Sequence, residues 1–401
     1  MLNRHYSLAF MPSALSLLTV FGGAMPVAIA QSPDPTLAHR PVNLSQSLQS
    51  VSSPSVSPSP TATTAPPILA QASPSLDFVA QMQHGNNVNA IGFSNNGQYL
   101  ASTGGDRFIR VWHIDSVLVD DQDSLVPVAI AVPESDGYVT SLTFAPGDRY
   151  LVTATFNGNV RVWDLQNCDP DPEIYFCASN LLLDQDYKGV SPVVRFHPNG
   201  QILAASNYDG TVTLWDWRSQ QIINILEAET GAHDGSRIDG RFSSLSFSPD
   251  GQFLAAGSHD TTITVWTMED FERVGVIDTG HGVDSVAFSP DSTWLASGNL
   301  YGIELRSIRV SRGRLKIDEE LLMDGQGRVN TLTFDATGQM VLGGDNRNNL
   351  LAWDLEEEEM LTIVPAQHQH TRPMLALALS PLGELMASSS TDGVIKLWHM
   401  Y

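Results

Sequence analysis

Three histidines near the C-terminus have the residue type and spacing that come nearest to a metal site in this sequence. His368 and His370 are two positions apart, so on a strand both side chains would lie on the same face, and His399 follows them. Neutral imidazole rings are common metal ligands. The alternative is that His368 lies in a turn and His370 takes part in structural hydrogen bonds. We favour this alternative and predict no metal ion.

Two acidic loops could offer hard oxygen ligands to calcium. They are residues 120–123 (DDQD) and 169–173 (DPDPE). Neither loop has the alternating ligand spacing with a glycine turn that calcium-binding loops use. We interpret both loops, and the acidic run at 356–359, as solvated surface, and we predict no cofactor.

The common catalytic motifs are absent from the sequence. It contains no glycine-rich phosphate-binding loop, no nucleophile elbow and no His-Glu-x-x-His helix. We therefore predict no catalytic residues and a protein that is not an enzyme.

The net charge limits the choice of partner. Among 401 residues, 44 acidic side chains outnumber 21 basic ones, which gives a formal charge of −23. Such a surface repels nucleic acid and anionic lipid, and we predict neither as a partner. Basic proteins and cations would be attracted, although a diffuse negative charge is typically only a solvated surface.

The first 30 residues have the features of a signal peptide. Arg4 and His5 provide a short polar start, residues 8–20 are mostly apolar, and Ala28-Ile29-Ala30 offers the small-x-small site that signal peptidase accepts. An uncleaved membrane anchor is the alternative, because the apolar stretch is about long enough to span a bilayer. We favour cleavage of residues 1–30. The mature protein would then lie in the periplasm or outside the cell, without membrane insertion.

Residues 31–75 form a segment rich in Ser, Pro, Thr and Ala, with almost no charge and no apolar period. Such a segment cannot bury enough surface to offset the entropy that ordering it would remove. We predict a disordered linker that acts as a flexible tether.

The chain has only two cysteines, Cys168 and Cys177. Two cysteines are too few for the thiolate clusters of common structural zinc sites. An exported protein folds in an oxidising compartment, and there we expect these two residues to form a disulfide.

The remaining sequence, which must position all these side chains, consists of seven repeats. Each repeat has an aromatic or apolar anchor, and the anchors are 41 to 52 residues apart: Phe93, Phe144, Phe196, Phe247, Phe288, Phe334 and Leu379. In six repeats a tryptophan follows the anchor by 19 residues: Trp112, Trp163, Trp215, Trp266, Trp353 and Trp398. Periods of this length are typical of propellers and solenoids.

Each repeat is predicted to form four short antiparallel strands. Pairs such as Asn96-Gly97 and Asp209-Gly210 mark tight hairpin turns between alternating runs with β-branched residues. A further strand is predicted ahead of the anchors at 126–132, 180–185, 222–227, 273–278, 318–323 and 360–366. One such sheet cannot bury both faces alone, whereas sheets stacked radially around an axis can. The expected fold class is therefore all-β.

The repeats resemble those of WD-repeat β-propellers. The resemblance rests on Phe-Ser-Pro-Asp-Gly at 247–251, on the Trp-Asp pairs at 163–164, 215–216 and 353–354, and on Gly280-His281. It covers residues 76–401 and implies a seven-bladed β-propeller of four-stranded antiparallel blades. It also implies that an N-terminal strand, here residues 76–83, closes the ring by completing the last blade.

The resemblance implies a buried hydrogen-bonded tetrad of His, Ser or Thr, Asp and Trp within a blade. Two blades have these residues, and the structural sets are His84, Asp106 and Trp112 in blade one and His370, Asp392 and Trp398 in blade seven. Blade five departs most, because Leu305-Arg306 stands where the tryptophan belongs and the repeat is one residue short there. We expect the weakest packing of the ring in blade five.

The resemblance also places the turns between second and third strands on an upper rim, the usual partner-binding face. Aromatic side chains recur there 12 residues after the anchor in blades two to four, namely Phe156, Tyr208 and His259. In blade five, Tyr301 stands beside the same slot. The long link at 227–242 shares this rim. Exposed aromatics are enriched at binding hot spots, and the alternative is that they pack locally.

We therefore predict an exported, monomeric, non-catalytic scaffold that binds protein partners through the upper rim. The alternative is a periplasmic-type enzyme, or a binder of a small ligand or cation, that uses the central channel. Inner-strand segments such as 376–378 and 332–333 lack ionisable residues, which favours the scaffold. A channel lined by several carboxylates or histidines would favour the alternative.

Overall fold

The computed structural model describes most of the chain from Leu76 onwards. The described residues are 76–118, 127–132, 137–170, 175–183, 193–207, 209–228, 241–324, 327–357, 359–362 and 366–401. The predicted signal peptide (1–30) and linker (31–75) lie outside them. Tyr208, the acidic loop at 120–123 and most of the link at 227–242 also lie outside the described residues.

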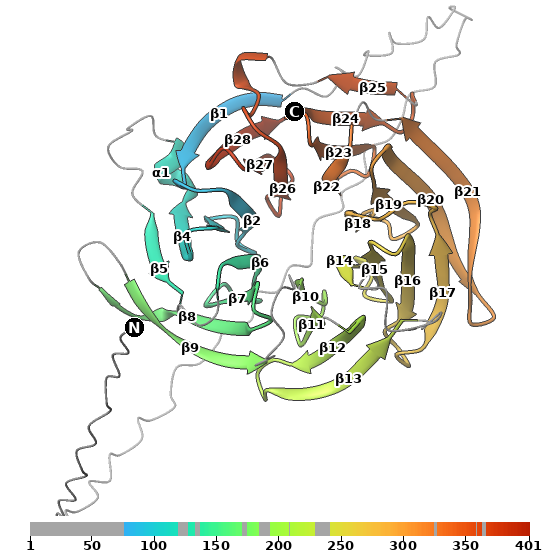
Figure 1. Ribbon diagram of the computed structural model, residues 1–401, viewed down its shortest axis with the longest axis horizontal. Helices are drawn as coiled ribbons and strands as arrows, with labels where there is room; N and C mark the ends of the chain where they lie inside the picture. The colour runs from blue at the N-terminus through green and yellow to red at the C-terminus, as the bar shows by residue number, and fades with distance from the viewer. Residues whose placement is uncertain are drawn as a thin grey trace, which may run out of the picture. The chain divides into compact units, whose positions relative to one another are not determined.

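From Leu76 onwards the described chain folds into seven four-stranded antiparallel blades around a central axis (Figure 1). In each blade the strands follow one another from the axis to the periphery, except that the last blade borrows its outermost strand from the start of the propeller. Blades one and two are joined at their outer strands by a single parallel bridge between Ile130 and Tyr175. The all-β fold and the count of seven blades are confirmed.

The strand bounds follow the predicted repeats closely. The innermost strands are β2 (Val88–Phe93), β6 (Val139–Phe144), β10 (Val194–Phe196), β14 (Phe242–Phe247), β18 (Ser285–Phe288), β22 (Val329–Phe334) and β26 (Met374–Leu379). The second strands are β3 (Tyr99–Gly104), β7 (Tyr150–Thr155), β11 (Ile202–Ser206), β15 (Phe253–Ser258), β19 (Trp294–Gly298), β23 (Met340–Asp345) and β27 (Leu385–Ser390). Every predicted anchor is the last residue of an innermost strand.

The outer half of each blade is formed by two more strands. The third strands are β4 (Phe108–His113), β8 (Val160–Pro170), β12 (Thr211–Asp216), β16 (Thr262–Thr267), β20 (Gly302–Ser311), β24 (Leu350–Asp354) and β28 (Val394–Met400). The outermost strands are β5 (Val128–Ala131), β9 (Tyr175–Leu183), β13 (Gln221–Glu227), β17 (Arg273–Asp278), β21 (Arg314–Asp324), β25 (Glu359–Thr362) and β1 (Leu76–Gln83).

The two ends of the propeller close the ring together. Strand β1 pairs antiparallel with β28 from Leu76, opposite Met400, to Gln83, opposite Val394, with one irregularity at residue 79. The backbone N–H of His84 then donates to the carbonyl oxygen of Gly393 at 2.9 Å. The predicted closing strand is confirmed, and blade seven needs both ends of the propeller sequence to form.

The repeat tryptophans fill the space between neighbouring blades. All six are at most 6% exposed. In blade six, for example, Trp353 packs among Ala296, Ile303 and Leu305 of blade five. Burial of a large apolar side chain stabilises a fold by about 2–3 kcal/mol, so each of the six tryptophans binds its blade to the one before it.

Two peripheral hairpins are longer than predicted. In blade two, β9 begins at Tyr175, because β8 and β9 continue past the cross-strand pair Cys168 and Cys177, which form the predicted disulfide. In blade five, β21 begins at Arg314, because Arg312 (φ 57°) and Gly313 (φ 69°) form a two-residue hairpin turn. Turns with two positive φ values match the twist of antiparallel strands, and glycine takes such a value without steric cost.

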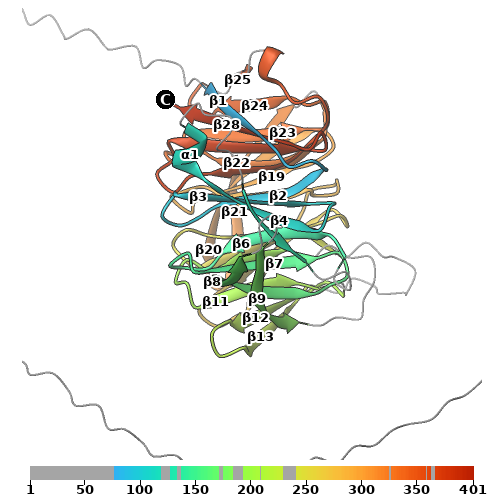
Figure 2. The ribbon, with the colours of Figure 1, turned by 90° about the vertical axis from the view of Figure 1, so that its left-hand side faces the viewer.

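Helix is confined to two short segments in the described part of the chain. These are α1 (Ile114–Leu118), which contacts β1 on the outside of the ring, and the 3₁₀ turn η3 (Ala366–His368) (Figure 2). No helix among the described residues is long and apolar enough to cross a membrane.

Candidate functional site

The predicted tetrad residues of blade one meet in a buried hydrogen-bond network. The Trp112 indole N–H donates to Ser102 Oγ at 2.9 Å, and His84 Nδ1 lies 3.0 Å from the same oxygen. On its other side, His84 Nε2 lies 3.3 Å from Asp106 Oδ1 and 3.0 Å from Arg110 Nη1. Arg110 completes an ion pair with Asp106 at 2.6 Å. The network ties the upper turn of the blade to its interior.

Blade seven repeats this arrangement with one change. The Trp398 indole N–H donates to Ser388 Oγ at 2.9 Å, His370 Nε2 lies 2.9 Å from that oxygen, and His370 Nδ1 lies 3.1 Å from Asp392 Oδ2. Lys396 stands where blade one has Arg110, and its ammonium group donates to the carbonyl oxygens of His368 and Gln369 at 2.8 and 2.7 Å. Both tetrads are fully used in structural hydrogen bonds.

Burial and hydrogen bonding shift the pKa values of the tetrad residues. Burial would raise the pKa of Asp106, but the hydrogen bonds from His84 and Arg110 lower it to about 2. Burial likewise opposes the shift of Asp392, yet the hydrogen bonds from His370 and from a backbone N–H hold its pKa well below the usual range. Burial lowers the pKa of His84. The aspartates are therefore charged and His84 is neutral near pH 7.

Blade five replaces the tryptophan of the tetrad with a buried arginine. Arg306 pairs with Leu295 across the hairpin, the position that the tryptophan takes in the other blades, and it is 4% exposed. Its Nη2 lies 2.7 Å from Glu304 Oε2 and 2.6 Å from Glu320 Oε1. Its Nη1 donates to Ser297 Oγ at 3.4 Å, so the guanidinium takes over the role of the indole N–H toward this serine.

The same ion pair extends to the upper rim. Asn299 Nδ2 donates to Glu304 Oε1 at 2.7 Å, and Asn299 Oδ1 accepts the backbone N–H groups of Tyr301 and Gly302 at 2.8 and 3.2 Å. Asn299 is 2% exposed. The rim turn of blade five is therefore fixed from below by a buried side chain, and the intervening residue Leu300 is left on the surface.

Exposed aromatic and apolar side chains gather on the rim between blades four and five. Tyr301 and His281 face each other with ring centroids 4.5 Å apart. The backbone of Gly282 lies against His259, since a methyl group on Gly282 would come within 3.7 Å of His259 Nδ1. We call His259, His281, Leu300 and Tyr301 the rim patch; all four are exposed. The structure thus brings together two of the predicted rim residues, His259 and Tyr301.

A charged pair borders the rim patch. Arg328 Nε donates to Asp284 Oδ2 at 2.6 Å, and a second bond joins Nη2 to Oδ1. His259 Nδ1 lies 3.8 Å from Asp284 Oδ1. The hydrogen bond with Asp284 raises the pKa of Arg328, so this arginine keeps its charge.

Phe156 belongs to a separate contact on blade two. Its ring stacks on Tyr138, with centroids 4.6 Å apart and an angle of 24° between the rings. Phe156 N donates to Tyr138 O at 2.9 Å, and both side chains are half-buried. The alternative of local packing therefore describes Phe156 better than it describes Tyr301. The fourth rim residue, Tyr208, lies outside the described residues.

The three C-terminal histidines do not converge. His368 stacks on Phe78 at 4.3 Å, His399 stacks on Tyr401 at 4.4 Å, and His370 is part of the tetrad. None of the described residues form a group of three His, Cys, Asp or Glu side chains that could hold a metal ion. The loop at 120–123 and residues 171–173 of the second acidic loop lie outside the described residues.

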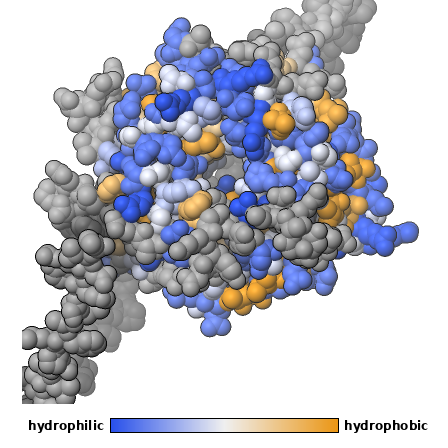
Figure 3. Space-filling model, viewed as in Figure 1, coloured by the Kyte–Doolittle hydropathy of each residue, from blue (hydrophilic) through white to orange (hydrophobic). Residues whose placement is uncertain are grey.

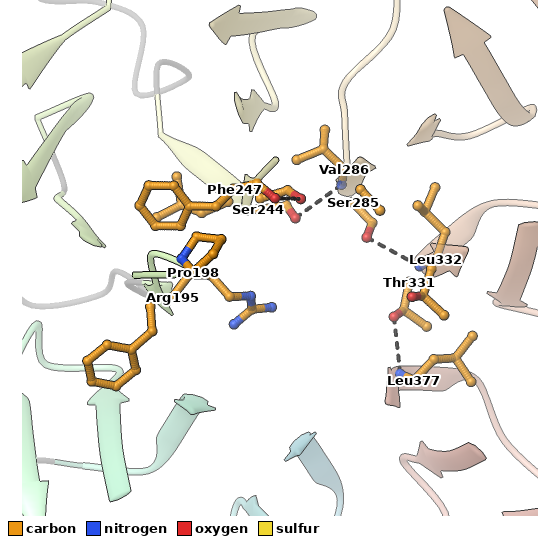
Figure 4. Close-up of a pocket in the computed structure, with 14 residues that line it drawn as sticks. Arg195, Pro198, Ser244, Phe247, Ser285, Val286, Thr331, Leu332 and Leu377 are labelled. Atoms are coloured by element: carbon orange, nitrogen blue, oxygen red, sulfur yellow. Dashed lines mark hydrogen bonds between the residues drawn. The ribbon is translucent and has the colours of Figure 1, made fainter. Parts of the chain in front are cut away.

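The axis of the propeller contains a cavity of about 350 Å³ (Figure 4). Its walls come from the inner strands of blades three to seven. The described residues that line it include hydroxyl, apolar and one arginine side chain, but no carboxylate, histidine or cysteine. The lining expected of a cation site or of a hydrolytic enzyme is therefore not found in this cavity.

Hydroxyl groups join neighbouring inner strands around the axis. Each lies three residues before an anchor and accepts a backbone N–H from the next blade, at 3.1 to 3.3 Å: Ser141 from Val194, Ser244 from Val286, Ser285 from Leu332 and Thr331 from Leu377. This pattern was not predicted from the sequence. The signal was present, because four of the seven repeats carry Ser or Thr at that slot.

Arg195 was also not identified from the sequence. It lies on β10, and its guanidinium points into the channel (Figure 4). Its Nη1 donates to Val194 O at 2.8 Å and to Ser141 Oγ at 3.3 Å. Protein atoms around Arg195 keep water away from its guanidinium, and this desolvation lowers its pKa. The side chain nevertheless reaches the open space of the channel.

Comparison with known sequences agrees with this architecture. A profile of the family described as "WD domain, G-beta repeat" matches residues 77–113, 129–164, 190–216, 228–267, 272–302 and 362–399. These segments together cover about half of the chain. None of them covers β22–β24 of blade six, whose second turn, Asp345-Asn346-Arg347-Asn348, departs from the common Asp-Gly form.

Several curated proteins share this similarity. The chain is 26% identical over 312 residues to the transcriptional corepressor LEUNIG_HOMOLOG of Arabidopsis thaliana, covering 76% of this chain and 34% of that protein. It is 25% identical to periodic tryptophan protein 2 of Arabidopsis thaliana, covering 73% of this chain and 31% of that protein. It is 23% identical to the guanine nucleotide-binding protein subunit beta of Oryza sativa subsp. japonica, covering 76% and 67%. The chain thus spans about a third of the length of the first two relatives.

Proposed function

This chain belongs to the WD40-repeat family, and we propose that it is a monomeric, non-catalytic platform whose protein partners bind on the upper rim of the propeller. Propellers of this family typically act as protein-interaction scaffolds. The relatives include a protein named as a corepressor and one named as a subunit, and such names describe components of larger assemblies.

The exposed rim turn of blade five is the observation that carries the proposal. Leu300 is 55% exposed and Tyr301 is 56% exposed, although both have large apolar surfaces. Asn299 holds their turn in place from below, so little conformational entropy is lost when a partner binds them. Rigid, exposed aromatic side chains are the usual anchors of protein interfaces.

The charge around the rim patch indicates the kind of partner. The chain has a formal charge of −23, and Asp260 and Asp278 flank the patch on blade four. We propose a partner that offers an apolar side chain to Leu300 and Tyr301 and basic residues around it. Complementary charge of this kind raises the rate of association.

We also propose that the protein acts after export. The signal-like residues 1–30, the Ser- and Pro-rich residues 31–75 and the disulfide between Cys168 and Cys177 support this proposal together. N-terminal sequencing of the mature protein tests it. A chain that still begins at Met1 would contradict cleavage.

Affinity capture with matched surface variants tests the rim as binding face. The tagged full chain is compared with the Leu300→Ala/Tyr301→Ala variant, with Phe156→Ala/Tyr208→Ala and with a control, Leu382→Ala. Leu382 is 80% exposed in the turn between β26 and β27, at the opposite end of the propeller from the rim. We expect the first variant to lose its partners, the second to lose fewer, and the control to keep them.

Equal recovery by the wild type and the Leu300→Ala/Tyr301→Ala variant would remove the rim patch from the proposed function. Thermal unfolding of each variant accompanies the capture. Because Leu300 and Tyr301 are exposed, we expect their replacement to change the free energy of unfolding by less than about 0.5 kcal/mol.

A further inference from the structure

The central channel contains a defined cavity that is lined by the inner strands. The lining includes Phe196 and Phe247, which end β10 and β14, and Pro198 in the turn that follows β10. Its volume of about 350 Å³ is in the range of pockets that hold small molecules. Figure 3 shows that the channel is open at its mouth, as a hollow near the centre of the molecule.

One inner-strand position distinguishes blade three from all the others. The residue before the anchor is small in six blades, namely Gly92, Thr143, Ser246, Ala287, Thr333 and Ala378. In blade three it is Arg195. Small side chains at this position leave room at the axis, and the arginine extends into that room.

The guanidinium of Arg195 retains free donors. Its Nη1 is engaged by Val194 O and Ser141 Oγ, whereas its Nε and Nη2 have no partner among the described residues. No carboxylate of the described lining neutralises it. Arginine stays protonated in proteins, so a positive charge with one open two-nitrogen edge faces the cavity. That edge matches the two oxygens of a carboxylate.

The hydroxyls of the cavity add further donors. Ser244, Ser285 and Thr331 each accept a backbone N–H, and none of them donates to any acceptor among the described residues. Each therefore keeps an O–H that can turn toward the cavity. Pro198, Ala287 and Leu377, which are not fully buried, supply the apolar part of the wall. A lining of donors and apolar groups, without acidic side chains, is suited to an anion with an apolar body.

We propose that this cavity binds a small monocarboxylate, whose two oxygens are held by Nε and Nη2 of Arg195. A single negative charge fits best, because the formal charge of −23 opposes the entry of polyanions. The apolar body of the ligand lies against Pro198, Ala287 and Leu377, and the hydroxyls donate to its remaining acceptors. This site is separate from the rim patch, so each can fail without the other.

Ligand-observed NMR titration of the full chain tests this assignment. The probes are sodium acetate, sodium lactate and sodium benzoate, with sodium chloride at matched ionic strength and inorganic phosphate as comparisons. One charge-assisted pair and a few hydrogen bonds correspond to a dissociation constant of about 1 mM. We expect at least one carboxylate to bind saturably, and Arg195→Gln to weaken it about tenfold or more.

Two variants make the result specific. Arg312→Gln removes the same charge from an exposed hairpin turn, and we expect it to bind like the wild type. Arg195→Lys keeps the charge but loses the two-nitrogen edge, so it binds more weakly than the wild type and decides the question if Arg195→Gln does not fold. Equal binding by wild type and Arg195→Gln, no saturable binding to the wild type, or tighter binding of phosphate than of every carboxylate would each overturn the proposal.

Discussion

The tryptophan slot of the repeat is filled by different side chains in two regions of the ring, blades one and seven on the one hand and blade five on the other. In blades one and seven a tryptophan packs between sheets and its indole N–H donates to Ser102 or Ser388. In blade five Arg306 takes that position and donates to Ser297, and two glutamates neutralise it. The serine is kept in all three blades, while the group that bonds to it changes.

This difference shows how the irregular blade five positions a turn on the surface. A tetrad stabilises its blade and holds the upper turn through its aspartate, because Asp106 and Asp392 accept the backbone N–H groups of Phe108 and Val394. The ion pair of blade five instead reaches Asn299, which fixes the turn that exposes Leu300 and Tyr301. Buried ion pairs add little stability compared with apolar packing, so we interpret this one as a device for positioning the rim turn.

Removal of a tetrad tryptophan has the largest expected effect. Trp398 is 1% exposed, and Trp398→Ala leaves a cavity at the closure of the ring. We expect a loss of about 4 kcal/mol in the free energy of unfolding, measured by urea denaturation. The control is Trp294→Ala, because this tryptophan lies outside the repeat slot and is only half-buried. A smaller loss for Trp398→Ala than for Trp294→Ala would contradict the role of the slot.

Removal of the arginine in blade five should have a somewhat smaller effect. Arg306→Ala leaves Glu304, which is 7% exposed, without its cation, and we expect a loss of about 3 kcal/mol by the same measurement. The double variant Glu304→Thr/Arg306→Trp introduces the pair that blade four uses, Thr264 and Trp266. Because no buried charge then remains in the slot, it should be within about 1 kcal/mol of the wild type. A double variant less stable than Arg306→Ala would contradict this interpretation.

The tetrads should also make stability depend on pH. Folding lowers the pKa of Asp106 to about 2 and also lowers that of Asp392, so the unfolded chain takes up protons first as the pH falls below about 4. Above that pH, each aspartate contributes about 1–2 kcal/mol to the free energy of unfolding. This contribution is lost as the pH falls toward the pKa of the aspartate in the folded protein. Folding also lowers the pKa of His84, which adds a loss that starts below about pH 6.5.

Urea midpoints between pH 7 and pH 3 check this expectation. The variant Asp106→Asn should show a smaller loss of stability between pH 4 and pH 3 than the wild type. An unchanged pH profile in this variant would show that the tetrad aspartate does not control the acid limb.

Replacement of the serine that the three blades share has the smallest expected effect. Ser102→Ala leaves the buried N–H of Trp112 without its acceptor at 2.9 Å, and we expect a loss of about 1–2 kcal/mol. Ser297→Ala removes two longer contacts, of 3.4 Å from Arg306 and 3.5 Å to the carbonyl oxygen of Glu304, while Arg306 keeps both glutamates, and should cost less than about 1 kcal/mol. Thermal unfolding of the two variants compares them, and the reverse order would contradict the comparison.

The fold could be predicted because its determinants recur. Tryptophans at a fixed distance from the anchors and glycines in the hairpin turns report the blades one by one, and residues 76–83 had only one place left to pair. The longer hairpin of blade five was missed, because Arg312-Gly313 was not recognised as a turn centre. The tetrad residues could be predicted from the resemblance, because His84 and His370 stand at the same position of their repeats relative to Asp106 and Asp392.

The sites were harder to predict, because they depend on contacts between blades. Nothing in the segment around Arg195 says that six other blades leave room for its side chain at the axis. Likewise, the exposure of Tyr301 depends on Asn299 and Glu304, which are polar residues with no motif around them. The stack of Phe156 on Tyr138 joins two strand ends that are 18 residues apart in the sequence. The aromatic slot alone could not distinguish this packed ring from an exposed one.

Site-specific photo-crosslinking tests most directly that blade five presents the binding face. A photoreactive phenylalanine analogue replaces Tyr301 in one version of the full chain and Leu382, at the opposite end, in another. We predict that position 301 captures protein partners and that position 382 does not. Capture from position 382 but not from position 301 would contradict the account.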